Sequence, residues 1–203
     1  MEIVLATSNP KKVKEMNAIM SGMQVRFRRL NEFSDVPEII EDGLTFEANA
    51  LKKAHVIFEH TGIMALADDS GIEVDALGGK PGVFSARYAG PAQDDRANLE
   101  KLLRDTEHVP DEKRTARFHC VIALVWGQAG NVMEKTFHGV MEGALLRAPR
   151  GTHGFGYDPI FMVPQYDGKA AAELDPDLKN KISHRGRALE QFKTFFEKEF
   201  FIR

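Results

Sequence analysis

The stretch ADDSGIEVDALGGKPGVFSARY, Ala67–Tyr88, carries two adjacent carboxylates, Asp68 and Asp69, between an apolar run and a glycine-rich segment. The apolar run, Met64–Ala67, has the length of a buried strand. It predicts that the aspartates lie where this strand ends and a loop begins, which is where α/β folds place ligands. Adjacent acids at such a point suit a hard cation and an activated water. Asp, Ser and Gly are also ordinary turn residues, so a solvated turn is the alternative.

The composition is that of an ordinary globular protein. The chain has 203 residues, 43% of them hydrophobic and 28% charged, which allows one large domain or two small lobes on a shared core. The net charge of −3 provides no basic field to attract nucleic acid or an anionic membrane. Any phosphate ligand must therefore be held by locally placed lysines and arginines.

A single cysteine, Cys120, lies inside the apolar run Phe118–Trp126. No intrachain disulfide is possible, which fits a reducing compartment, and we expect a buried, inert thiol. The first residues lack a signal-peptide pattern, and no apolar run approaches the roughly 20 residues of a membrane span. These features predict a cytoplasmic protein without membrane contact.

The N-terminal segment predicts a strand, a short polar loop and a helix. Glu2–Ala6 is aliphatic, and TSNPKK, Thr7–Lys12, follows with cap-forming residues and a proline suited to a first helical turn. Lys11 and Lys12 oppose the helix dipole there unless an anion binds at the same end. Because helix N-termini bind anions through free N–H groups, TSNPKK is predicted to be a phosphate-binding turn. Helical spacing places one apolar face on Val13, Met16 and Met20.

Hydrophobic periodicity predicts the other elements. We expect strands at Val25–Leu30, Thr115–Trp126, Val132–Val140 and Tyr157–Val163, a hairpin connection at Gly127–Asn131, and helices at Thr45–His60, Ala92–Asp105 and from Lys179 to the end. The apolar face of the second helix comprises Phe46, Ala50, Ala54, Ile57 and Phe58. The predicted fold is mixed α/β, a partly antiparallel central sheet flanked by helices, in a single domain over residues 1–203 without a linker that divides it.

Several patches, in order along the chain, resemble one family. They are TSNPKK at Thr7–Lys12, EDGLTFEANALKKA at Glu41–Ala54, ADDSGIEVDALGGKPGVFSARYAG at Ala67–Gly90, GFGYDPIF at Gly154–Phe161 and AAELDPDLKNKISHRGRAL at Ala171–Leu189. Together they resemble the inosine/xanthosine triphosphate pyrophosphatases, the dITP/XTP house-cleaning enzymes. The resemblance implies Mg²⁺-dependent hydrolysis of deaminated purine nucleoside triphosphates to the monophosphate and pyrophosphate. It also implies a homodimer of elongated two-lobed protomers, each with a deep cleft between its lobes.

The resemblance assigns the phosphate and metal chemistry to three patches. Asp69 corresponds to the catalytic acid, as Mg²⁺ ligand and acceptor of a proton from the attacking water; Glu41 corresponds to the second metal carboxylate, and Asp68 supports them. Lys53 is implied as a catalytic cation that neutralises charge on the departing phosphates, the main task in phosphoryl transfer. The implied substrate-phosphate residues are Thr7, Ser8, Asn9, Pro10, Lys11 and Lys12, with Ser70 holding the substrate through its backbone.

The nucleoside residues are assigned in the same way: Phe155, Gly156, Tyr157 and Asp158 for the nucleoside, and Lys179, Ser183, His184 and Arg185 for the base edge. An aromatic face stacks on a purine, and glycine lets the backbone approach it. Hypoxanthine and xanthine carry an oxygen at C6 where adenine carries an amino group. Donors from His184 and Arg185 would pair with that oxygen and be left unsatisfied by adenine. No residue that rejects guanine is identified.

One position departs from the family pattern. The family commonly has a second glutamate directly before the asparagine of its TFEEN-like patch, where this chain has Ala48. Glu47 is the nearest substitute, but it points about 100° away on a helix. Glu41 and Asp42 are both candidates for the second metal carboxylate.

Two other functions are consistent with parts of the sequence. One is a nucleotide pyrophosphatase for another base, such as a modified pyrimidine. The other is a non-catalytic protein that binds nucleotide or RNA. The acidic balance argues against RNA, and the presence of Asp69, Glu41 and Lys53 argues against loss of catalysis.

Overall fold

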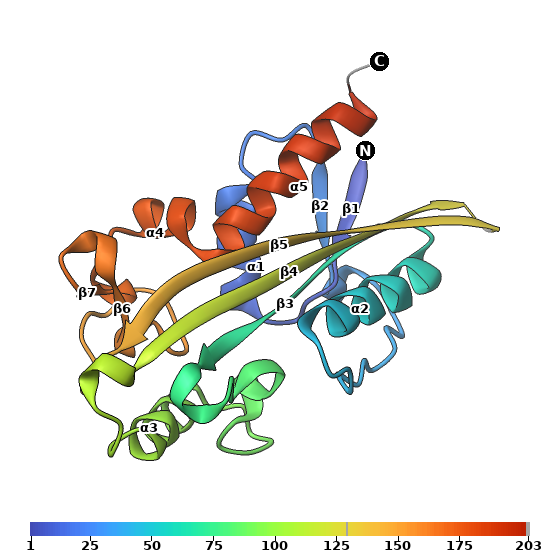
Figure 1. Cartoon of the computed structure of the whole chain (residues 1–203). Coiled ribbons are helices and arrows are strands. Elements are labelled where there is room, and N and C mark those ends of the chain that lie inside the picture. Colours follow the sequence, from blue (N-terminus) through green and yellow to red (C-terminus); the bar gives the residue numbers. More distant parts are fainter. Residues whose placement is uncertain (129, 202–203) are drawn as a thin grey trace. The chain divides into compact units, whose positions relative to one another are not determined.

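The computed structural model describes residues 1–128 and 130–201. Within these residues one mixed sheet of seven strands has the order β2-β1-β3-β4-β5-β6-β7 (Figure 1). The strands are β1 (Glu2–Leu5), β2 (Arg26–Arg29), β3 (Met64–Val74), β4 (Thr115–Gln128), β5 (Asn131–Leu145), β6 (Phe161–Val163) and β7 (Lys169–Ala170). The helices are α1 (Pro10–Ile19), α2 (Phe46–Thr61), α3 (Asp95–Asp105), α4 (Pro176–Ile182) and α5 (His184–Phe200). The predicted mixed α/β class is confirmed.

The sheet combines parallel and antiparallel pairing. β1 pairs in parallel with β2 and with β3, whereas β6 pairs antiparallel with β5 and with β7. β4 and β5 are neighbours joined by residues 129 and 130, so they form the predicted hairpin. Ala129, in the predicted hairpin connection, lies outside the described residues.

The chain comprises two compact units. Unit 1 contains Met1–Asp69, Cys120–Gly139 and Arg185–Arg203, and unit 2 contains Ser70–His119 and Val140–His184. The chain passes from one unit to the other between consecutive residues, without a linker segment. Strands β3, β4 and β5 contribute residues to both units.

In unit 1 the helices cover both faces of the sheet. α1 and α5 lie on one face and α2 on the other (Figure 1). The first face is a core in which Ile3 and Leu5 meet the apolar stripes of α1 and α5, including Val13, Met16, Met20, Leu189, Phe192 and Phe196. Val4 and Ala65 are buried but lie outside this core, because successive residues of a strand point to opposite faces. The stripe predicted for α2, Phe46, Ala50, Ala54, Ile57 and Phe58, is buried as expected.

Unit 2 has its own core, built from the far ends of β3–β5, β6, α3 and the segments around them, and it includes Ile72, Leu102, Phe118, Phe161 and Leu174. Four predicted elements differ in detail, and one of them is the strand predicted at Val132–Val140, which as β5 extends to Leu145. α3 begins at Asp95 rather than Ala92, because the Asp94 side chain accepts from Ala97 N and caps the helix there. Only the end of Tyr157–Val163 is a strand, since Asp158–Ile160 forms a 3₁₀ turn around Pro159. The C-terminal helix is two helices, α4 and α5, separated at Ser183.

The main correction concerns the two aspartates. The strand predicted to end at Ala67 continues to Val74, so Asp68 and Asp69 lie inside β3 and not in a loop after it. Both are buried, at 0% and 5% exposure. A solvated turn is therefore wrong for this stretch, and the glycine-rich loop begins only beyond the strand. Charged residues can occupy a buried strand only when other groups compensate them.

Candidate active site

The parallel part of unit 1 provides a topological switch point. β1 has β2 on one side and β3 on the other, and the crossover helices α1 and α2 lie on opposite faces (Figure 1). Ligands bind at the carboxyl ends of strands where the order reverses in this way. Here the end of β1 leads into Thr7–Lys12, and the neighbouring strand carries Asp68 and Asp69.

Thr7–Lys12 forms the predicted capped turn. Pro10 opens α1, and the Asn9 side chain accepts from the backbone N–H groups of Lys11 and Lys12. The first turn of α1 contains no acidic residue. Ser8, Asn9, Pro10 and Lys11 are exposed, so this positively charged helix end is open to a ligand.

Asp68 and Asp69 point to opposite faces of β3, because they are successive residues of a strand. Asp68 faces α1 and α5. Its Oδ2 lies 3.0 Å from Lys12 Nζ and accepts from Arg185 Nη2, also at 3.0 Å. The guanidinium of Arg185 also donates through Nη1 to Glu15 Oε2 at 2.5 Å. This face therefore holds a network of two carboxylates and two cations, of which Asp68 and Arg185 are buried.

The charge of Asp68 is strongly favoured in the folded state. Burial alone would raise the pKa of Asp68, but Lys12, Arg185 and Lys53 outweigh burial and hold that pKa well below its usual range. The same network raises the pKa of Arg185 against the effect of its burial. Asp68 is thus a fixed anion that compensates buried cations.

Asp69 faces α2 and lies in a different environment. Its Oδ2 accepts from Asn49 Nδ2 at 3.1 Å, and its Oδ1 accepts from Lys53 Nζ at 3.2 Å. Lys53 Nζ also donates to Glu41 Oε1 at 2.7 Å. One ammonium therefore joins the two carboxylates that the sequence assigned to a metal, Glu41 and Asp69.

The pKa of Asp69 is raised, in contrast to that of its neighbour. Burial is the main cause, and the nearby charge of Glu41 adds to it, while Lys53, Lys12 and the hydrogen bond from Asn49 act in the opposite direction. The pKa of Lys53 is also raised, because the charges of Asp69, Asp68 and Glu41 outweigh the effect of its burial. The cluster contains two carboxylates, Glu41 and Asp69, and one ammonium, Lys53, so its negative charge is not fully compensated.

Asn49 and Gly43 are functional candidates that the sequence analysis did not single out. Asn49 is fully buried and accepts from Gly43 N at 2.8 Å through Oδ1 while it donates to Asp69. A Cβ at Gly43 would lie 2.6 Å from Asn49 Oδ1, so only glycine lets the loop approach this closely. The available signal was a polar residue, Asn49, within the apolar stripe of α2 and one turn before Lys53.

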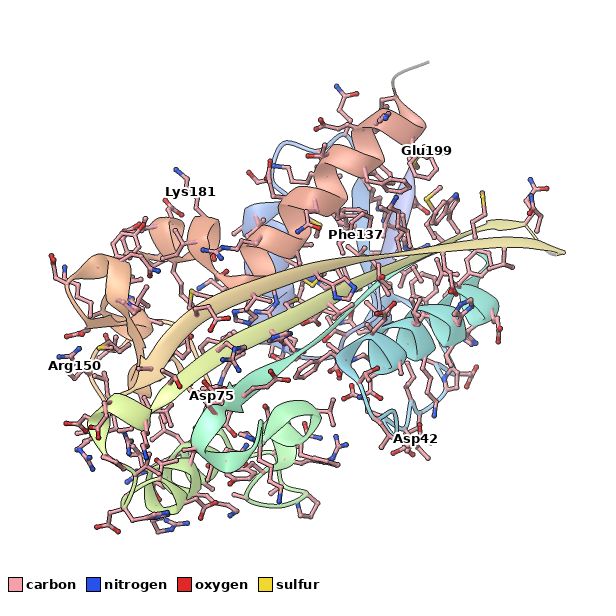
Figure 2. The ribbon with its side chains drawn as sticks, in the orientation of Figure 1. Asp42, Asp75, Phe137, Arg150, Lys181 and Glu199 are labelled. Atoms are coloured by element: carbon pink, nitrogen blue, oxygen red, sulfur yellow. The ribbon has the colours of Figure 1, made fainter. Side chains whose placement is uncertain are left out.

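The acidic residues around Asn49 take separate positions. Asp42 is exposed on the loop before α2 (Figure 2) and pairs with Lys52 Nζ at 2.7 Å, so of the two candidates only Glu41 is held at the Lys53 ammonium. Glu47 does not substitute for the glutamate absent at Ala48. Its carboxylate accepts from Thr136 Oγ1 at 3.2 Å instead.

Unit 2 contains the residues assigned to the nucleoside except Arg185, which belongs to unit 1. Asp158 Oδ2 accepts from Phe155 N at 2.8 Å and from Lys179 Nζ at 2.5 Å, and Lys179 Nζ lies 5.5 Å from the centroid of the Phe155 ring. Asp158 and Lys179 are buried. Gly154 has φ +76°, and a Cβ there would lie 2.1 Å from Asp158 Oδ2, so the turn requires glycine.

The two aromatic residues of this segment differ in exposure. Phe155 is half-buried, whereas Tyr157 is 6% exposed and belongs to the core of unit 2. Of the two rings, only that of Phe155 is partly exposed. Ser183 ends α4 with its N–H donating to Lys179 O, and the His184 ring stacks on Phe118 with centroids 4.7 Å apart. Ser70, the first residue of unit 2, is half-buried within β3.

Comparison with known proteins identifies the family. The model of the Ham1 family matches residues 3–195. The chain belongs to the Ham1 family. A relative from Geobacter sulfurreducens, named dITP/XTP pyrophosphatase, is 52% identical over 191 residues, 94% of each chain. A solved Ham1 protein from Coxiella burnetii is 48% identical with a TM-score of 0.87, covering 97% of this chain and 98% of that one. The Ham1 protein of Staphylococcus aureus is 37% identical with a TM-score of 0.86, covering 98% and 100%.

The donor set of this Ham1 chain fits a hard divalent cation. Glu41 and Asp69 already share one positive group, and the raised pKa of Asp69 indicates that further positive charge is favourable there. Mg²⁺ usually takes one or two carboxylates and completes its shell with water and phosphate oxygens. The described residues contain no cluster of three or more His, Cys, Asp or Glu side chains that could hold a metal.

No helix within residues 1–128 and 130–201 is long and apolar enough to cross a membrane.

Proposed function

We infer that this Ham1-family chain hydrolyses dITP, ITP and XTP to the nucleoside monophosphate and pyrophosphate, and so removes deaminated purines from the nucleotide pool. The observation that carries the inference is the buried cluster of Asp69, Lys53 and Glu41 at the switch point of unit 1. The named relatives of about 50% identity supply the substrate class.

The triphosphate is bound at Thr7–Lys12. The open N-terminus of α1 offers backbone N–H groups, and Lys11 and Lys12 add positive charge. Lys53 adds a second cation near the same oxygens, and Ser70 contributes through its backbone. Their shared task is to stabilise charge on the departing pyrophosphate, which dominates catalysis of phosphoryl transfer.

Mg²⁺ is the proposed cofactor, with Glu41 and Asp69 as its protein ligands. When bound, it would supply a Lewis acid for the phosphate oxygens and orient the attacking water. Asp69 accepts the proton from that water. Its raised pKa makes it a stronger base than an ordinary aspartate, and a general base works best when its pKa approaches the working pH.

The base is bound by the nucleoside residues. Phe155 stacks on the purine, with Gly156, Tyr157 and Asp158 forming the segment that presents it. Lys179, Ser183, His184 and Arg185 read the C6 oxygen. The contacts of the Arg185 guanidinium with Glu15 and Asp68 fix its orientation.

The wider context of the site is also a proposal. One nucleotide supplies both the phosphates and the base that these residues bind, and the active form is a homodimer in the cytoplasm. The resemblance to the pyrophosphatase family supports these statements, and no nucleic acid or membrane partner is expected.

A substrate panel tests the function. Pyrophosphate release is measured with ITP, XTP, dITP, GTP, ATP and dTTP, with and without Mg²⁺. We expect release from ITP, dITP and XTP only with Mg²⁺. A preference for dTTP would establish the rival function, a pyrophosphatase for another base. No release from any nucleotide, with ITP still bound, would establish a non-catalytic nucleotide-binding protein.

The role of Asp69 has its own test. Asp69→Asn keeps the size of the side chain and one of its two acceptor oxygens but removes its charge, and we expect loss of pyrophosphate release by a factor of about 1,000 or more with the fold intact. Asp42→Asn is the control, because Asp42 is exposed and pairs with Lys52. Turnover retained in Asp69→Asn would refute the assigned role.

A further inference from the structure

The hydroxyl of Tyr157 is one of the groups that attach the nucleoside segment, Phe155–Asp158, to the rest of unit 2. This hydroxyl donates to the backbone carbonyl of Ser85 at 2.8 Å, and both residues are buried. Its pKa is raised, chiefly by burial, so the group remains a donor at all physiological pH values. The ring of Tyr157 packs in the core of unit 2. Its hydroxyl therefore helps to hold the neighbouring residues Phe155 and Asp158 in position.

Ser85 is itself fixed to β3. Its Oγ accepts from Ile72 N at 2.9 Å and donates to Gly82 O at 2.6 Å, within the 3₁₀ turn Gly82–Arg87. Ile72 lies three residues beyond Asp69 along the strand. The side chain of Ser85 thus holds the strand while its carbonyl holds the nucleoside segment.

Two residues near the start of α3 also hydrogen-bond to the turn that follows Ser85 and to the nucleoside segment. Asn98, 2% exposed, accepts from Ala89 N at 2.6 Å and donates to Ala86 O at 2.8 Å. Asp95, one turn earlier, accepts from Gly156 N at 3.3 Å. Residues three apart on a helix share a face, so one face of α3 contacts both the turn after Ser85 and the nucleoside segment.

We propose that Ser85 is a positioning residue for base recognition: through the Tyr157 hydroxyl it fixes the nucleoside segment relative to β3. The proposal rests on the proposed function. It assigns Ser85 no contact with substrate. It predicts that loosening this connection weakens binding of the base and leaves binding of the phosphates intact, because Thr7–Lys12 and Lys53 belong to unit 1.

The test separates base from phosphate binding. Tyr157→Phe removes only the hydroxyl and keeps the ring in the core. We expect inosine monophosphate to bind about 5- to 10-fold more weakly, the effect of one buried hydrogen bond, and magnesium pyrophosphate to bind as before. The KM for ITP should rise by a similar factor, with a smaller change in kcat. Both affinities are measured by titration calorimetry.

Tyr88→Phe is the matched control. It also removes a tyrosine hydroxyl of unit 2, one that donates to Asp105 Oδ2 at 2.5 Å, but Tyr88 makes no hydrogen bond to the nucleoside segment in the described residues. We expect its affinity for inosine monophosphate to match the wild type. Ser85→Ala should weaken this affinity as Tyr157→Phe does, since the turn loses its attachment to Ile72, and Ser85→Thr should restore most of it.

Three outcomes would overturn the proposal. One is unchanged affinity of Tyr157→Phe for inosine monophosphate, and another is an equal loss of affinity for inosine monophosphate and pyrophosphate, which would indicate general destabilisation. A third is an equal loss in Tyr88→Phe. Failure of the proposed function is distinguishable, because the wild type itself would then fail to bind inosine monophosphate.

Discussion

Asp68 and Asp69 are adjacent in sequence but have opposite electrostatic surroundings. A strand turns successive side chains to opposite faces, so one carboxylate meets the cations of α1 and α5 and the other meets the polar residues of α2. The pKa of Asp68 is lowered and the pKa of Asp69 is raised. The charge of Asp68 therefore stabilises the folded state, whereas the charge of Asp69 destabilises it.

This contrast predicts opposite effects of the same substitution. Asp68→Asn leaves the buried Arg185 and the half-buried Lys12 with one anion fewer, and we expect a loss of about 3 kcal/mol of stability, or roughly 6–12 °C in Tm. Asp69→Asn removes a charge that folding disfavours, so its Tm should equal or exceed that of the wild type while activity is lost. Thermal denaturation at pH 7 measures both. Equal destabilisation by the two changes would contradict the assignment of the two faces.

For single residues, the sequence predicts the chemical role of the side chains better than their secondary structure and burial. The motifs indicate the acids and lysines of the site, but Asp-Asp-Ser-Gly has the composition of a turn and gives no sign of the strand that runs through it. Local preference favours a turn there, whereas Lys12, Arg185, Lys53 and Asn49 make a buried strand possible. Those partners come from distant segments, so their proximity cannot be read from the local sequence.

Among the elements, the loop before α2 controls the position of Glu41. Gly43 lies against Asn49, which in turn binds Asp69, so loop and strand share one side chain. Gly43→Ala would place a Cβ 2.6 Å from Asn49 Oδ1 and displace either the loop or the amide. We expect a fall in kcat/KM for ITP of about tenfold or more, measured by pyrophosphate release.

The adjacent position provides the control for this prediction. Asp42→Ala changes the same loop but removes only an exposed pair with Lys52, which contributes little to stability. Its kcat/KM should stay within twofold of the wild type. If Gly43→Ala were equally active, the approach of Gly43 to Asn49 would not matter for the site.

The end of β5 is secured by a buried arginine. Arg114 donates to the carbonyls of Leu145, Leu146 and Thr106 and to the Thr106 hydroxyl, and it is 2% exposed. Arg114→Met would leave these four acceptors without their donor, at about 1–3 kcal/mol for each, so we expect a total loss of about 4 kcal/mol or more. Chemical denaturation with urea measures it.

Arg117→Met is the comparison. Arg117 pairs with Asp75 at 2.7 Å and Glu142 at 3.1 Å on the surface, where ion pairs contribute at most about 1 kcal/mol. A loss for Arg117→Met as large as that for Arg114→Met would show that burial of the guanidinium does not set the size of the effect.

For the whole molecule, the sequence predicted the fold class and most elements, because long apolar stripes and capped ends determine them locally. α2 begins after Thr45 and its apolar stripe is buried as expected, and the β4–β5 hairpin follows from two apolar segments around a glycine-rich connection. The sheet order and the two compact units did not follow from local pattern. They depend on which strands pair over long separations, and β3, β4 and β5 each contribute to both units.

The single cysteine reports on the integrity of the whole molecule. Cys120 is buried in the core of unit 1, and burial raises the pKa of its thiol from an ordinary value of about 8.5 to about 12. The folded state therefore keeps this proton where the unfolded state loses it, so the contribution of Cys120 to stability is complete below about pH 8.5 and is lost as the pH rises toward 12.

Alkylation with iodoacetamide at pH 8 should consequently label Cys120 only when the chain opens. We expect one thiol per chain to react promptly in 6 M guanidinium chloride and at a rate at least 100-fold slower in buffer, because the thiolate is the reactive form and the native thiol is both protonated and inaccessible. Inosine monophosphate should slow native labelling further, since a ligand that binds only the folded state lowers the population of open molecules. Prompt labelling of the native protein would contradict the burial of Cys120, and labelling unaffected by saturating ligand would show that the thiol becomes exposed without loss of the binding site.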